Sequence, residues 1–503
     1  MVFLVQCVGL ALAGWLSYEW HRFRIIRRKV EHIPAVGPDN FLGAYLSAWK
    51  FFICGQRMIE EGYQKYHGGV FRVATFETSS RWLIIGAGPQ FADDIRRTND
   101  EMMDVVEPAI EYLQMDWTFG AGKDMRHRDG EHHLMALKGL MTRNLASCFG
   151  DIQKEVEISF KAFLPATERW TSYPVRETLL HIVTQTTNRF FIGLPLCRDR
   201  EYCVAMEKFA GKFILSAYAI NLSPAFLRPI IARFTSNAEG TLKVIQARLG
   251  PTIEARLKED SDKSNDMITW LLDCAPDRYR NVDDVVFRLL LTNFAAIHST
   301  TITISDILFH LAVHQEYIAP LRVEIEDVVG ANGWTKDAMA QLHKLDSFMK
   351  EVARMGGVQI VAGTRKTKKD FTFSNGVTVP KGFTITSASG AQHYDPSLYE
   401  HPDVFDGNRF LAAKGADQGD GLKQAKQQMV ALDTNYLLFG LGRHACPGRF
   451  LAVNELKAIA GYVLLNYDVK LEGGANVPPG GLFFGTARSA NVSARILFRK
   501  RRS

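Results

Sequence analysis

The sequence predicts a mainly α-helical fold with a small β-rich part and one N-terminal transmembrane helix. Apolar residues recur at helical spacing over long segments, whereas strand-like segments are few and short. With 47% hydrophobic and 23% charged residues, the 503-residue chain is too apolar for a disordered protein and long enough for a large core. No linker-like stretch divides it, so we expect one large domain over residues 39–503.

The first element is a candidate membrane anchor at residues 1–20. Val2–Tyr18 is nearly all apolar, and a basic cluster follows at residues 21–29. At about 1.5 Å per residue a helix of this length spans about 25 Å, close to the ~30 Å core of a bilayer. The charge order places the N-terminus in the lumen and the rest in the cytosol. A cleaved signal peptide would carry its charges before the apolar run, so we favour a retained anchor.

The next element is a hinge at residues 21–38, which joins the basic cluster to Pro34 and Pro38. Proline restricts φ and biases the preceding residue toward an extended form, so this segment reads as a stiff connection to a globular body. No later run reaches about 18 apolar residues, which predicts a single pass. The net charge of +6 is too mild to indicate nucleic acid, but it suits an anionic membrane or an acidic partner.

The body contains the periodic segments that predict helices and the short segments that predict strands. Helices are expected over residues 152–164, 176–189, 238–258, 282–314, 320–329, 335–355 and 451–465. Strands are expected over residues 69–74, 81–85, 371–373, 377–379 and 384–387. Asn375-Gly376 between two of these strands predicts a hairpin, because both residues tolerate positive φ at a turn. Residues 412–426 are rich in Gly, Lys, Asp and Gln, which is typical of an exposed loop.

The chain has seven scattered cysteines and no CxxC pair, so a zinc site or a disulfide framework is not indicated. Buried thiols in a reducing compartment would explain most of them. Cys446 differs, because it stands in the glycine-rich segment 439–450 (FGLGRHACPGRF), just before an amphipathic helix. Backbone N–H groups of such a loop and the start of the helix favour a thiolate, the form that binds haem iron.

This segment resembles the haem-binding signature of the cytochrome P450 family. The positions that match are Phe439, Gly442, His444, Cys446 and Gly448. The resemblance implies the cytochrome P450 fold and makes Cys446 the axial ligand of the iron in haem b.

Two further segments resemble family motifs in the expected order. Glu351 and Arg354 form Glu-x-x-Arg, and their i,i+3 spacing puts both side chains on one helix face. Downstream, residues 405–410 (FDGNRF) resemble the family's meander motif. The resemblance implies that Arg409 completes a buried structural triad with Glu351 and Arg354. Such a triad would hold the cysteine loop without taking part in the chemistry, and loss of one member should prevent haem incorporation.

The segment 295–300 (AAIHST) lies in the long apolar helix and resembles the family's oxygen-activating segment. Small Ala295 and Ala296 would let haem and O₂ approach the backbone. The hydroxyl of Ser299, followed by Thr300, would relay protons, although a serine bonded back to its own helix is the alternative. His298 replaces the usual acidic residue. It could substitute as a group that titrates near neutral pH, or it could be a packed core histidine.

Haem propionates require cationic or hydrogen-bonding partners, and by resemblance the candidates are His444, Arg365 and Lys138. The nearby His127, Glu131, His132 and His133 could mimic a metal cluster, but neither an open-site spacing nor a second ligand set accompanies them, so we do not expect a separate metal site.

The resemblance also implies the electron supply and the location. O₂ would be used with NADPH-derived electrons, passed on by a membrane-bound NADPH–cytochrome P450 reductase, with cytochrome b5 as a second candidate donor. The catalytic domain would face the cytosol from the endoplasmic reticulum membrane.

The substrate is expected to be a hydrophobic small molecule, because the segments that by resemblance should line the pocket are mostly apolar and aromatic. These segments are residues 105–122, 205–230, 289–300, 356–363 and 481–487, and the expected wall residues in them are Trp117, Phe119, Phe213, Ile214, Phe294, Ile297, Val358, Ile360, Val361, Phe483 and Phe484. By analogy we expect a terpenoid-like intermediate of fungal natural-product biosynthesis. Two alternatives remain. One is a reductase-independent haem-thiolate enzyme that acts on hydroperoxides or as an isomerase, and the other is a non-enzymatic membrane haem- or lipid-binding protein.

Overall fold

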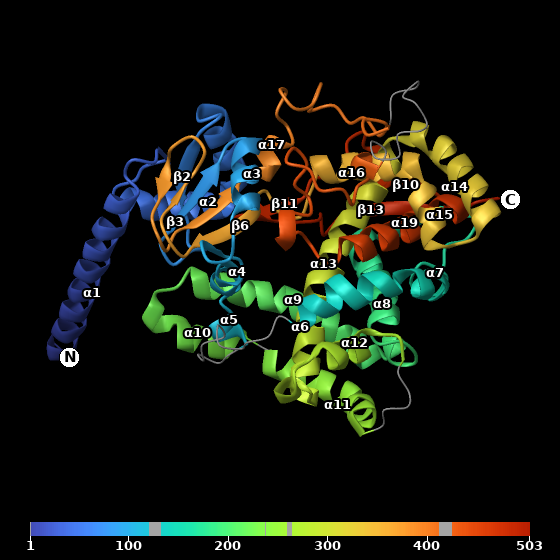
Figure 1. The fold of residues 1–503 in the computed structure, drawn as a ribbon, viewed down its shortest axis with the longest axis horizontal. Coiled ribbons are helices and arrows are strands. Elements are labelled where there is room, and N and C mark those ends of the chain that lie inside the picture. Colours follow the sequence, from blue (N-terminus) through green and yellow to red (C-terminus); the bar gives the residue numbers. More distant parts are fainter. Residues whose placement is uncertain (1, 120–131, 237, 259–263, 412–424, 503) are drawn as a thin grey trace.

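The structure is a computed structural model that describes residues 2–119, 132–236, 238–258, 264–411 and 425–502. Figure 1 shows a β-rich part that contains β2, β3 and β6 beside a larger helical part, with α1 projecting from the β-rich side. The predicted mainly α fold with a small β-rich part is therefore confirmed. Of the predicted exposed loop, residues 412–424 lie outside the described part of the chain.

The helices of the first half lead from the N-terminus to the centre of the molecule. They are α1 Val2–Lys29, α2 Phe41–Lys65, α3 Pro89–Arg97, α4 Val106–Leu113, α5 Met115–Thr118, α6 His132–Met135, α7 Thr142–Phe163, α8 Val175–Phe191, α9 Arg200–Asn221, α10 Arg228–Thr235, α11 Ala238–Lys258 and α12 Met267–Cys274. A π-helical turn, η2 Ala136–Met141, joins α6 to α7.

The helices of the second half surround the cysteine segment. They are α13 Val282–Val313, α14 Ile318–Asn332, α15 Lys336–Gln341, α16 His343–Met355, α17 Ser389–Gln392 and α19 Arg449–Asn466, with the short turn η7 Gly442–His444 before α19. The prediction of one continuous helix over residues 335–355 is wrong, because the segment divides into α15 and α16 at Leu342, whose ψ of 76° is not helical.

The strands form one larger sheet and three small ones. They are β1 Ala35–Val36, β2 Val70–Ala74, β3 Trp82–Gly86, β4 Met103–Asp104, β5 Thr171–Pro174, β6 Ala362–Thr367, β7 Phe371–Thr372, β8 Thr378–Val379, β9 Thr384–Ser387, β10 Tyr467–Leu471, β11 Leu482–Phe484, β12 Ala487–Ser489 and β13 Arg495–Lys500. The larger sheet has the order β1-β2-β3-β9-β6-β4. The predicted hairpin is confirmed, since β7 pairs with β8 and Gly376 has a φ of 85°.

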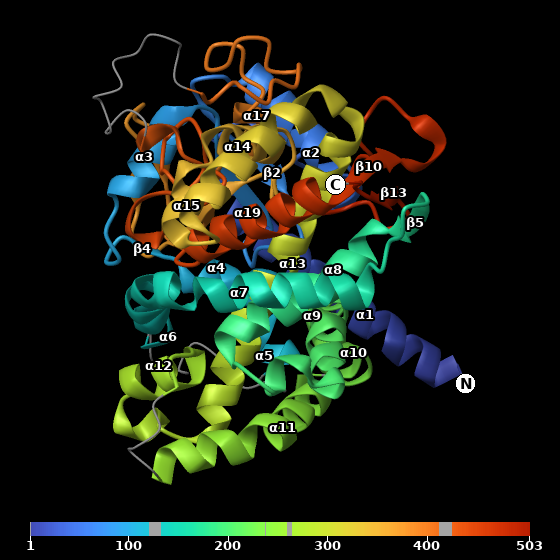
Figure 2. The same ribbon diagram turned by 90° about the vertical axis from the view of Figure 1, so that its right-hand side faces the viewer.

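Helix α13 runs through the middle of the molecule and organises the core. Asn281 caps it by accepting from the N–H of Asp284, and the helix packs against α8, α11, α16 and α19. Figure 2 shows it passing behind α7 and α8. Among the described residues it is the helix found long and apolar enough to cross a membrane, whereas α1, where the sequence predicts the span, does not meet this criterion. However, 61% of the apolar window of α13 is buried inside the fold. It is therefore a core helix here.

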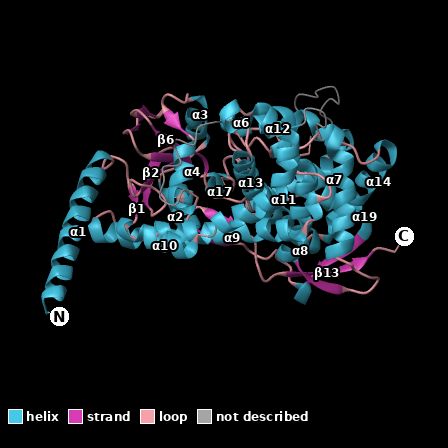
Figure 3. Ribbon diagram, turned by 90° about the horizontal axis from the view of Figure 1, so that it is seen from below, coloured by secondary structure: helices cyan, strands magenta, loops and turns pink. Residues whose placement is uncertain are grey.

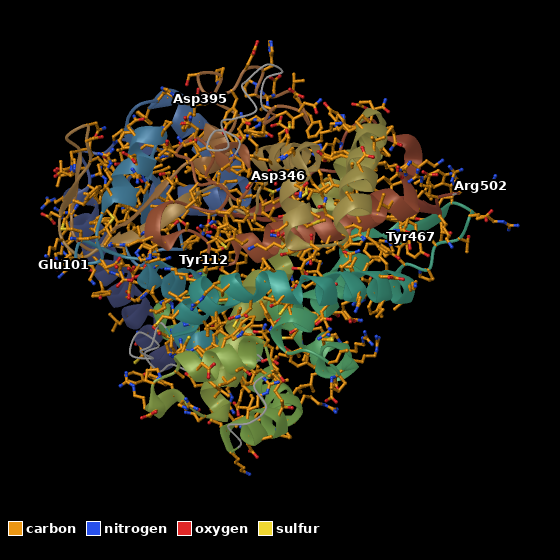
Figure 4. All side chains as sticks on the ribbon, turned by 45° about the vertical axis from the view of Figure 1, so that its right-hand side comes forward. Glu101, Tyr112, Asp346, Asp395, Tyr467 and Arg502 are labelled. Atoms are coloured by element: carbon orange, nitrogen blue, oxygen red, sulfur yellow. The ribbon has the colours of Figure 1, made fainter. Side chains whose placement is uncertain are left out.

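A buried ion pair fixes α16 to α19, the helix that follows the cysteine segment. The Lys457 Nζ lies 2.7 Å from the Asp346 carboxylate, which also accepts from the N–H of Met429. In Figure 4 Asp346 lies within the helical part, whereas Glu101 and Arg502 lie at opposite edges of the molecule. The helix that carries the predicted site residues Glu351 and Arg354 is thus joined directly to the helix that follows Cys446.

The second half of α1 packs on the β-rich part, and its first half projects away from it (Figure 3). Phe23 makes ring contacts with Phe41 and Trp82, and Arg27 pairs with Asp39 at 3.0 Å. The helix continues without a break through the basic cluster as far as Lys29.

Candidate active site

The cysteine loop, residues 439–448, makes a tight turn that depends on glycine. Gly440 and Gly442 have φ values of 67° and 64°, which glycine adopts without strain. A β-carbon on Gly442 would also lie 2.9 Å from Cγ of Arg96. The N–H of Cys446 closes the turn by donating to the carbonyl of Phe439 at 2.8 Å. The loop therefore presents Cys446 immediately before α19.

The Cys446 side chain keeps accessible surface. Burial raises the pKa of its thiol, while the N–H groups of Gly448 and Arg449 and the charge of Arg449 act in the opposite direction. The loop thus supplies the backbone donors that the sequence predicts. A coordinated cation would outweigh the burial, because a thiol that binds a metal is deprotonated.

Glu351, Arg354 and Arg409 come together below the loop. Arg354 donates to both carboxylate oxygens of Glu351, at 2.7 and 2.8 Å, and Arg409 Nε donates at 3.0 Å. The side chains of Glu351 and Arg354 are completely buried. Arg409 also donates to backbone carbonyls of the meander, including that of Val404 at 2.9 Å. This arrangement gives every charge a partner, which a buried ionic network requires.

His393, which the sequence did not single out, connects this network to the cysteine loop. Arg354 Nη1 donates to the carbonyl of His393, and His393 Nδ1 lies 3.2 Å from the carbonyl of Arg354. Its Nε2 accepts from the N–H of Leu437 at 3.0 Å. Burial, together with the charge of Arg354, lowers the pKa of His393 to about 4. A neutral imidazole protonated on Nδ1 satisfies both bonds.

On α13 the predicted oxygen-activating residues divide between two faces. Ala295, His298 and Ser299 face a cavity, whereas Thr300 is buried and Ala296 packs toward the core. The Ser299 hydroxyl donates to the Ala295 carbonyl at 2.6 Å, so in this structure it is bonded back to its helix. Burial, with a smaller effect of the charge on Arg176, lowers the pKa of His298 to about 4. The expectation that His298 titrates near neutral pH is therefore wrong.

The predicted propionate partners lie around Arg443, next to the cysteine loop. Lys138 Nζ donates to the Arg443 carbonyl at 3.0 Å, and His444 Nε2 lies 2.7 Å from the Asp100 carboxylate. Although partial desolvation opposes it, the hydrogen bond from His444 and the nearby cations lower the pKa of the Asp100 carboxyl. Arg365 is buried, and among the described residues its recorded bond is to its neighbour's carbonyl, that of Thr364.

The histidine cluster is only partly described. His127 and Glu131 lie outside the described residues. His132 Nε2 lies 2.9 Å from the carboxylate of Asp284, and His133 Nδ1 lies 3.0 Å from the guanidinium of Arg288. Both described histidines therefore join the segment before α7 to α13.

A cavity of about 790 Å³ lies between α13, α9, the segment 356–363 and the β11–β12 hairpin. Of the predicted pocket residues, the structure places Ile214, Phe294, Val358, Val361 and Phe484 in its wall. The remaining predicted wall residues lie elsewhere: Trp117, Phe119, Phe213, Ile297, Ile360 and Phe483. For example, Phe119 packs on Phe213 with ring centroids 4.8 Å apart. Apart from Trp117, these apolar residues belong to the core or pack against it.

Comparison with known proteins identifies this arrangement. A family model described as cytochrome P450 matches residues 50–484. The chain belongs to the cytochrome P450 family. It is 36% identical over 486 residues to cytochrome P450 monooxygenase 71 of Postia placenta, which covers 94% of both chains. It is 26% identical over 504 residues to ent-kaurene oxidase P450-4 of Gibberella fujikuroi, which covers 98% of this chain and 97% of the relative.

A solved structure shows the same fold. The retinoic acid-bound cyanobacterial CYP120A1 superposes with a TM-score of 0.68 at 18% identity, over 93% of this chain and 99% of that chain. The membership of the P450 family that the cysteine motif suggests is thus confirmed, and the similarity extends over most of the chain. As a member of the P450 family, the protein is an oxidoreductase of the monooxygenase type, and membership implies a thiolate-ligated haem and the use of O₂.

The residues of this P450 fit a haem. The accessible thiol of Cys446 has backbone donors nearby. Burial lowers the pKa of Arg365 to about 10, with a smaller opposing effect of the Asp100 carboxylate. A buried cation that lacks a described carboxylate at hydrogen-bonding distance suits the propionate of a cofactor. The charge of Arg443 acts on Arg365, and the Arg443 carbonyl accepts from Lys138.

Proposed function

We propose that the protein is a haem-thiolate monooxygenase that oxidises a hydrophobic small molecule, in the manner of a terpenoid-modifying enzyme of fungal natural-product biosynthesis. The observation that carries this proposal is the cavity. Apolar residues of α9, α13 and the β11–β12 hairpin enclose it, and it reaches Gly440 of the cysteine loop and Leu437 just before the loop. An apolar molecule in this space would lie between α13 and the loop.

Cys446 would bind the iron, and Arg365, Lys138 and His444 would hold the propionates. When bound, the haem supplies the activation of O₂, which no side chain of the chain can perform. The protein would contribute the thiolate, held by the N–H groups of Gly448 and Arg449, and the orientation of the substrate. Ser299 would hold a proton at its Oγ, within the cavity wall and one residue from His298.

The relatives support the substrate class. One of them is named an ent-kaurene oxidase, and ent-kaurene is an apolar hydrocarbon. The wall of the cavity in this chain is largely apolar, with Phe294, Ile214 and Phe484 among its larger residues. A substrate that partitions into membranes suits such a wall, because its transfer from water is driven by burial of apolar surface.

The surface near α1 supports a membrane location. Exposed apolar residues occur on α1 (Phe3, Leu10, Leu16, Tyr18), on α2 (Leu42, Leu46, Trp49, Ile53) and around α10 (Phe226, Ile230, Phe234). Trp15 of α1 contacts Phe226, so the projecting helix and the α10 region share one side of the molecule. Clustered apolar surface of this kind marks contact with a membrane.

We infer that α1 is the single-pass anchor in the endoplasmic reticulum membrane, with residues 39–503 in the cytosol. Electrons from NADPH would come through a membrane-bound NADPH–cytochrome P450 reductase, with cytochrome b5 as a further donor. The net charge of +6 favours an acidic partner.

The first experiment is the absorption spectrum of the reduced, carbon monoxide-bound protein, prepared with haem. We expect the strongly red-shifted band of a thiolate ligand, lost in Cys446→Ser and retained in Cys274→Ser, a half-buried cysteine on α12. A band typical of a neutral or imidazole ligand in the wild type would contradict the assignment of Cys446.

The second experiment separates the proposal from its alternatives. The membrane-bound protein is incubated with ent-kaurene and related apolar terpenes, either with NADPH and a P450 reductase or with a hydroperoxide alone. Product that requires NADPH and the reductase supports the monooxygenase. Product without them indicates a reductase-independent enzyme, and no turnover of any substrate favours a binding protein.

A further inference from the structure

The charged residues in the wall of the cavity are both arginines. Arg176 and Arg488 line it, and the described wall contains no Asp or Glu. Arg488 is neutralised, because its guanidinium donates to the Asp306 carboxylate at 2.5 and 3.1 Å and both side chains are buried. Arg176 is therefore the uncompensated charge of the described cavity wall.

Arg176 stands in the first turn of α8 and is half-buried. Among the described residues no hydrogen bond or ion pair is recorded for its side chain. Burial lowers the pKa of Arg176, and no described carboxylate acts against this effect. A cation in the first turn also opposes the helix dipole. The protein thus keeps a partly desolvated guanidinium at the cavity without the anion that would stabilise it.

His298 is a second polar residue of the cavity wall, and it lies near Arg176. The charge of Arg176 contributes to lowering the pKa of His298, which places the two side chains within electrostatic range. His298 Nε2 is buried and has no described hydrogen-bond partner. Arg176 and the Nε2 of His298 are therefore two polar groups without described partners at a largely apolar cavity, whose wall also contains polar residues such as Gln359.

The haem propionates do not account for Arg176. The cationic groups that suit them, Arg365, Lys138 and His444, gather around Arg443 beside the cysteine loop. The small pocket that contains Arg365 shares Gly363 and Gly440 with the cavity but does not include Arg176. Arg365 and Arg176 therefore line different pockets.

We propose that Arg176 is a specificity residue that binds the carboxylate of an otherwise hydrophobic substrate. This inference rests on the proposed function and deepens it, since it makes the preferred substrate an apolar acid rather than a neutral hydrocarbon. A guanidinium suits this task because its paired N–H groups match a carboxylate in two parallel hydrogen bonds. Terpenoid acids and fatty acids share this chemistry, and the experiment distinguishes them.

The test measures binding to the full-length, haem-loaded protein in detergent by calorimetry. The probes are abietic acid, its methyl ester and palmitic acid. We expect the wild type to bind abietic acid more tightly than the ester. Arg176→Gln should lower the affinity for abietic acid by about 10- to 100-fold, which is the range for a hydrogen bond between charged groups. It should lower the affinity for the ester by less than about threefold.

Matched variants isolate the charge in the cavity. Arg176→Lys keeps the charge and should retain part of the preference for the acid, with less than the full affinity because lysine lacks the paired donors. Arg169→Gln removes an exposed arginine just before the neighbouring strand β5 and should leave both affinities unchanged. Tighter binding of abietic acid than of palmitic acid would assign the terpenoid acids, and the reverse would assign the fatty acids.

Equal binding of acid and ester by the wild type would overturn the proposal. A loss of haem or of the thiolate spectrum in Arg176→Gln would overturn it as well, since Arg176 would then serve the cofactor. The proposed function fails on a different result, the absence of a thiolate band in the wild type. The calorimetric ratio of acid to ester still decides the role of Arg176 in that case.

Discussion

The two sides of the candidate active site are built in opposite ways. Around the cysteine loop, both oxygens of Glu351, the guanidinium nitrogens of Arg354 and both ring nitrogens of His393 have partners. On the α13 side, Arg176 and the Nε2 of His298 have none among the described residues. The network that supports the loop is complete without a ligand, whereas the α13 side leaves polar groups that a ligand could complete.

This difference follows from what each side must hold. A loop that presents a metal ligand has to keep one geometry. A fully satisfied buried network imposes that geometry, because any other arrangement leaves a buried charge without a partner. A substrate cavity needs apolar surface and a small number of free polar groups that the ligand completes. The predictions below test whether this division holds, beginning with the largest effect.

The largest effect is expected when the network below the loop is broken. Glu351→Gln should destabilise the protein by about 3–5 kcal/mol, because it leaves the buried guanidinium of Arg354 without a carboxylate. Urea unfolding measures the loss, and the haem content of purified protein should fall with it. Glu157→Gln is the matched control, since it removes a carboxylate from the exposed pair with Lys161 and should cost less than about 1 kcal/mol. Similar losses of stability in both variants would show that the buried network is no more important for stability than an exposed ion pair.

The second effect concerns pH and His393. Its pKa in the folded protein is about 4, whereas an unfolded histidine titrates near 6.5. Between these values the unfolded chain binds the additional proton, so stability is lost as the pH falls from about 6.5 toward 4. The loss from this group should be about 2–4 kcal/mol.

Urea unfolding of the wild type and of His393→Gln across this pH range isolates the contribution. Glutamine keeps a donor and an acceptor but does not titrate, so the stability advantage of the wild type should shrink as the pH falls. An advantage that stays constant from pH 7 to pH 4 would show that His393 does not couple protonation to the network.

The third effect compares two glycines of the cysteine loop. Both Gly440 and Gly442 have positive φ, so alanine strains the backbone at either position by about 1 kcal/mol. A β-carbon at Gly442 also meets Arg96 at 2.9 Å, whereas at Gly440 the nearest contact is 4.0 Å. Gly442→Ala should therefore cost about 1–2 kcal/mol more than Gly440→Ala. Thermal unfolding gives the difference, and equal losses would mean that Arg96 moves aside.

The parts of the site that the sequence could predict are those whose residues lie close together in the chain. Glu351 and Arg354 are three residues apart on one helix, and the glycines flank Cys446 directly, so spacing alone indicates their relation. The helix periods located α11 and α13 with nearly their observed ends. Local patterns therefore predict the elements and the cysteine loop well.

The remaining residues act through contacts distant in sequence. His393 bonds Arg354 and Leu437, which lie 39 and 44 positions away, and no local pattern marks such a residue. Arg176 is a single arginine in an ordinary helix start, and its meaning depends on the cavity that α9 and α13 enclose. The pocket residues predicted by analogy failed at Phe119 and Phe213 because an apolar side chain suits a core and a cavity wall equally.

The smallest effect on stability is expected at Ser299. Its hydroxyl donates to the Ala295 carbonyl, a bond within a helix whose own backbone bonds are complete, so Ser299→Ala should change stability by less than about 0.5 kcal/mol. Thr303, one turn later, makes the same kind of bond to the Ser299 carbonyl but does not line the described cavity wall. If Ser299 handles protons for O₂ activation, Ser299→Ala should lower the product formed per NADPH several-fold, and Thr303→Ala should not. Equal product yields in the two variants would reduce Ser299 to a helix-bonded serine, whereas a stability loss as large as that of Glu351→Gln would show that the cavity side is as tightly built as the loop.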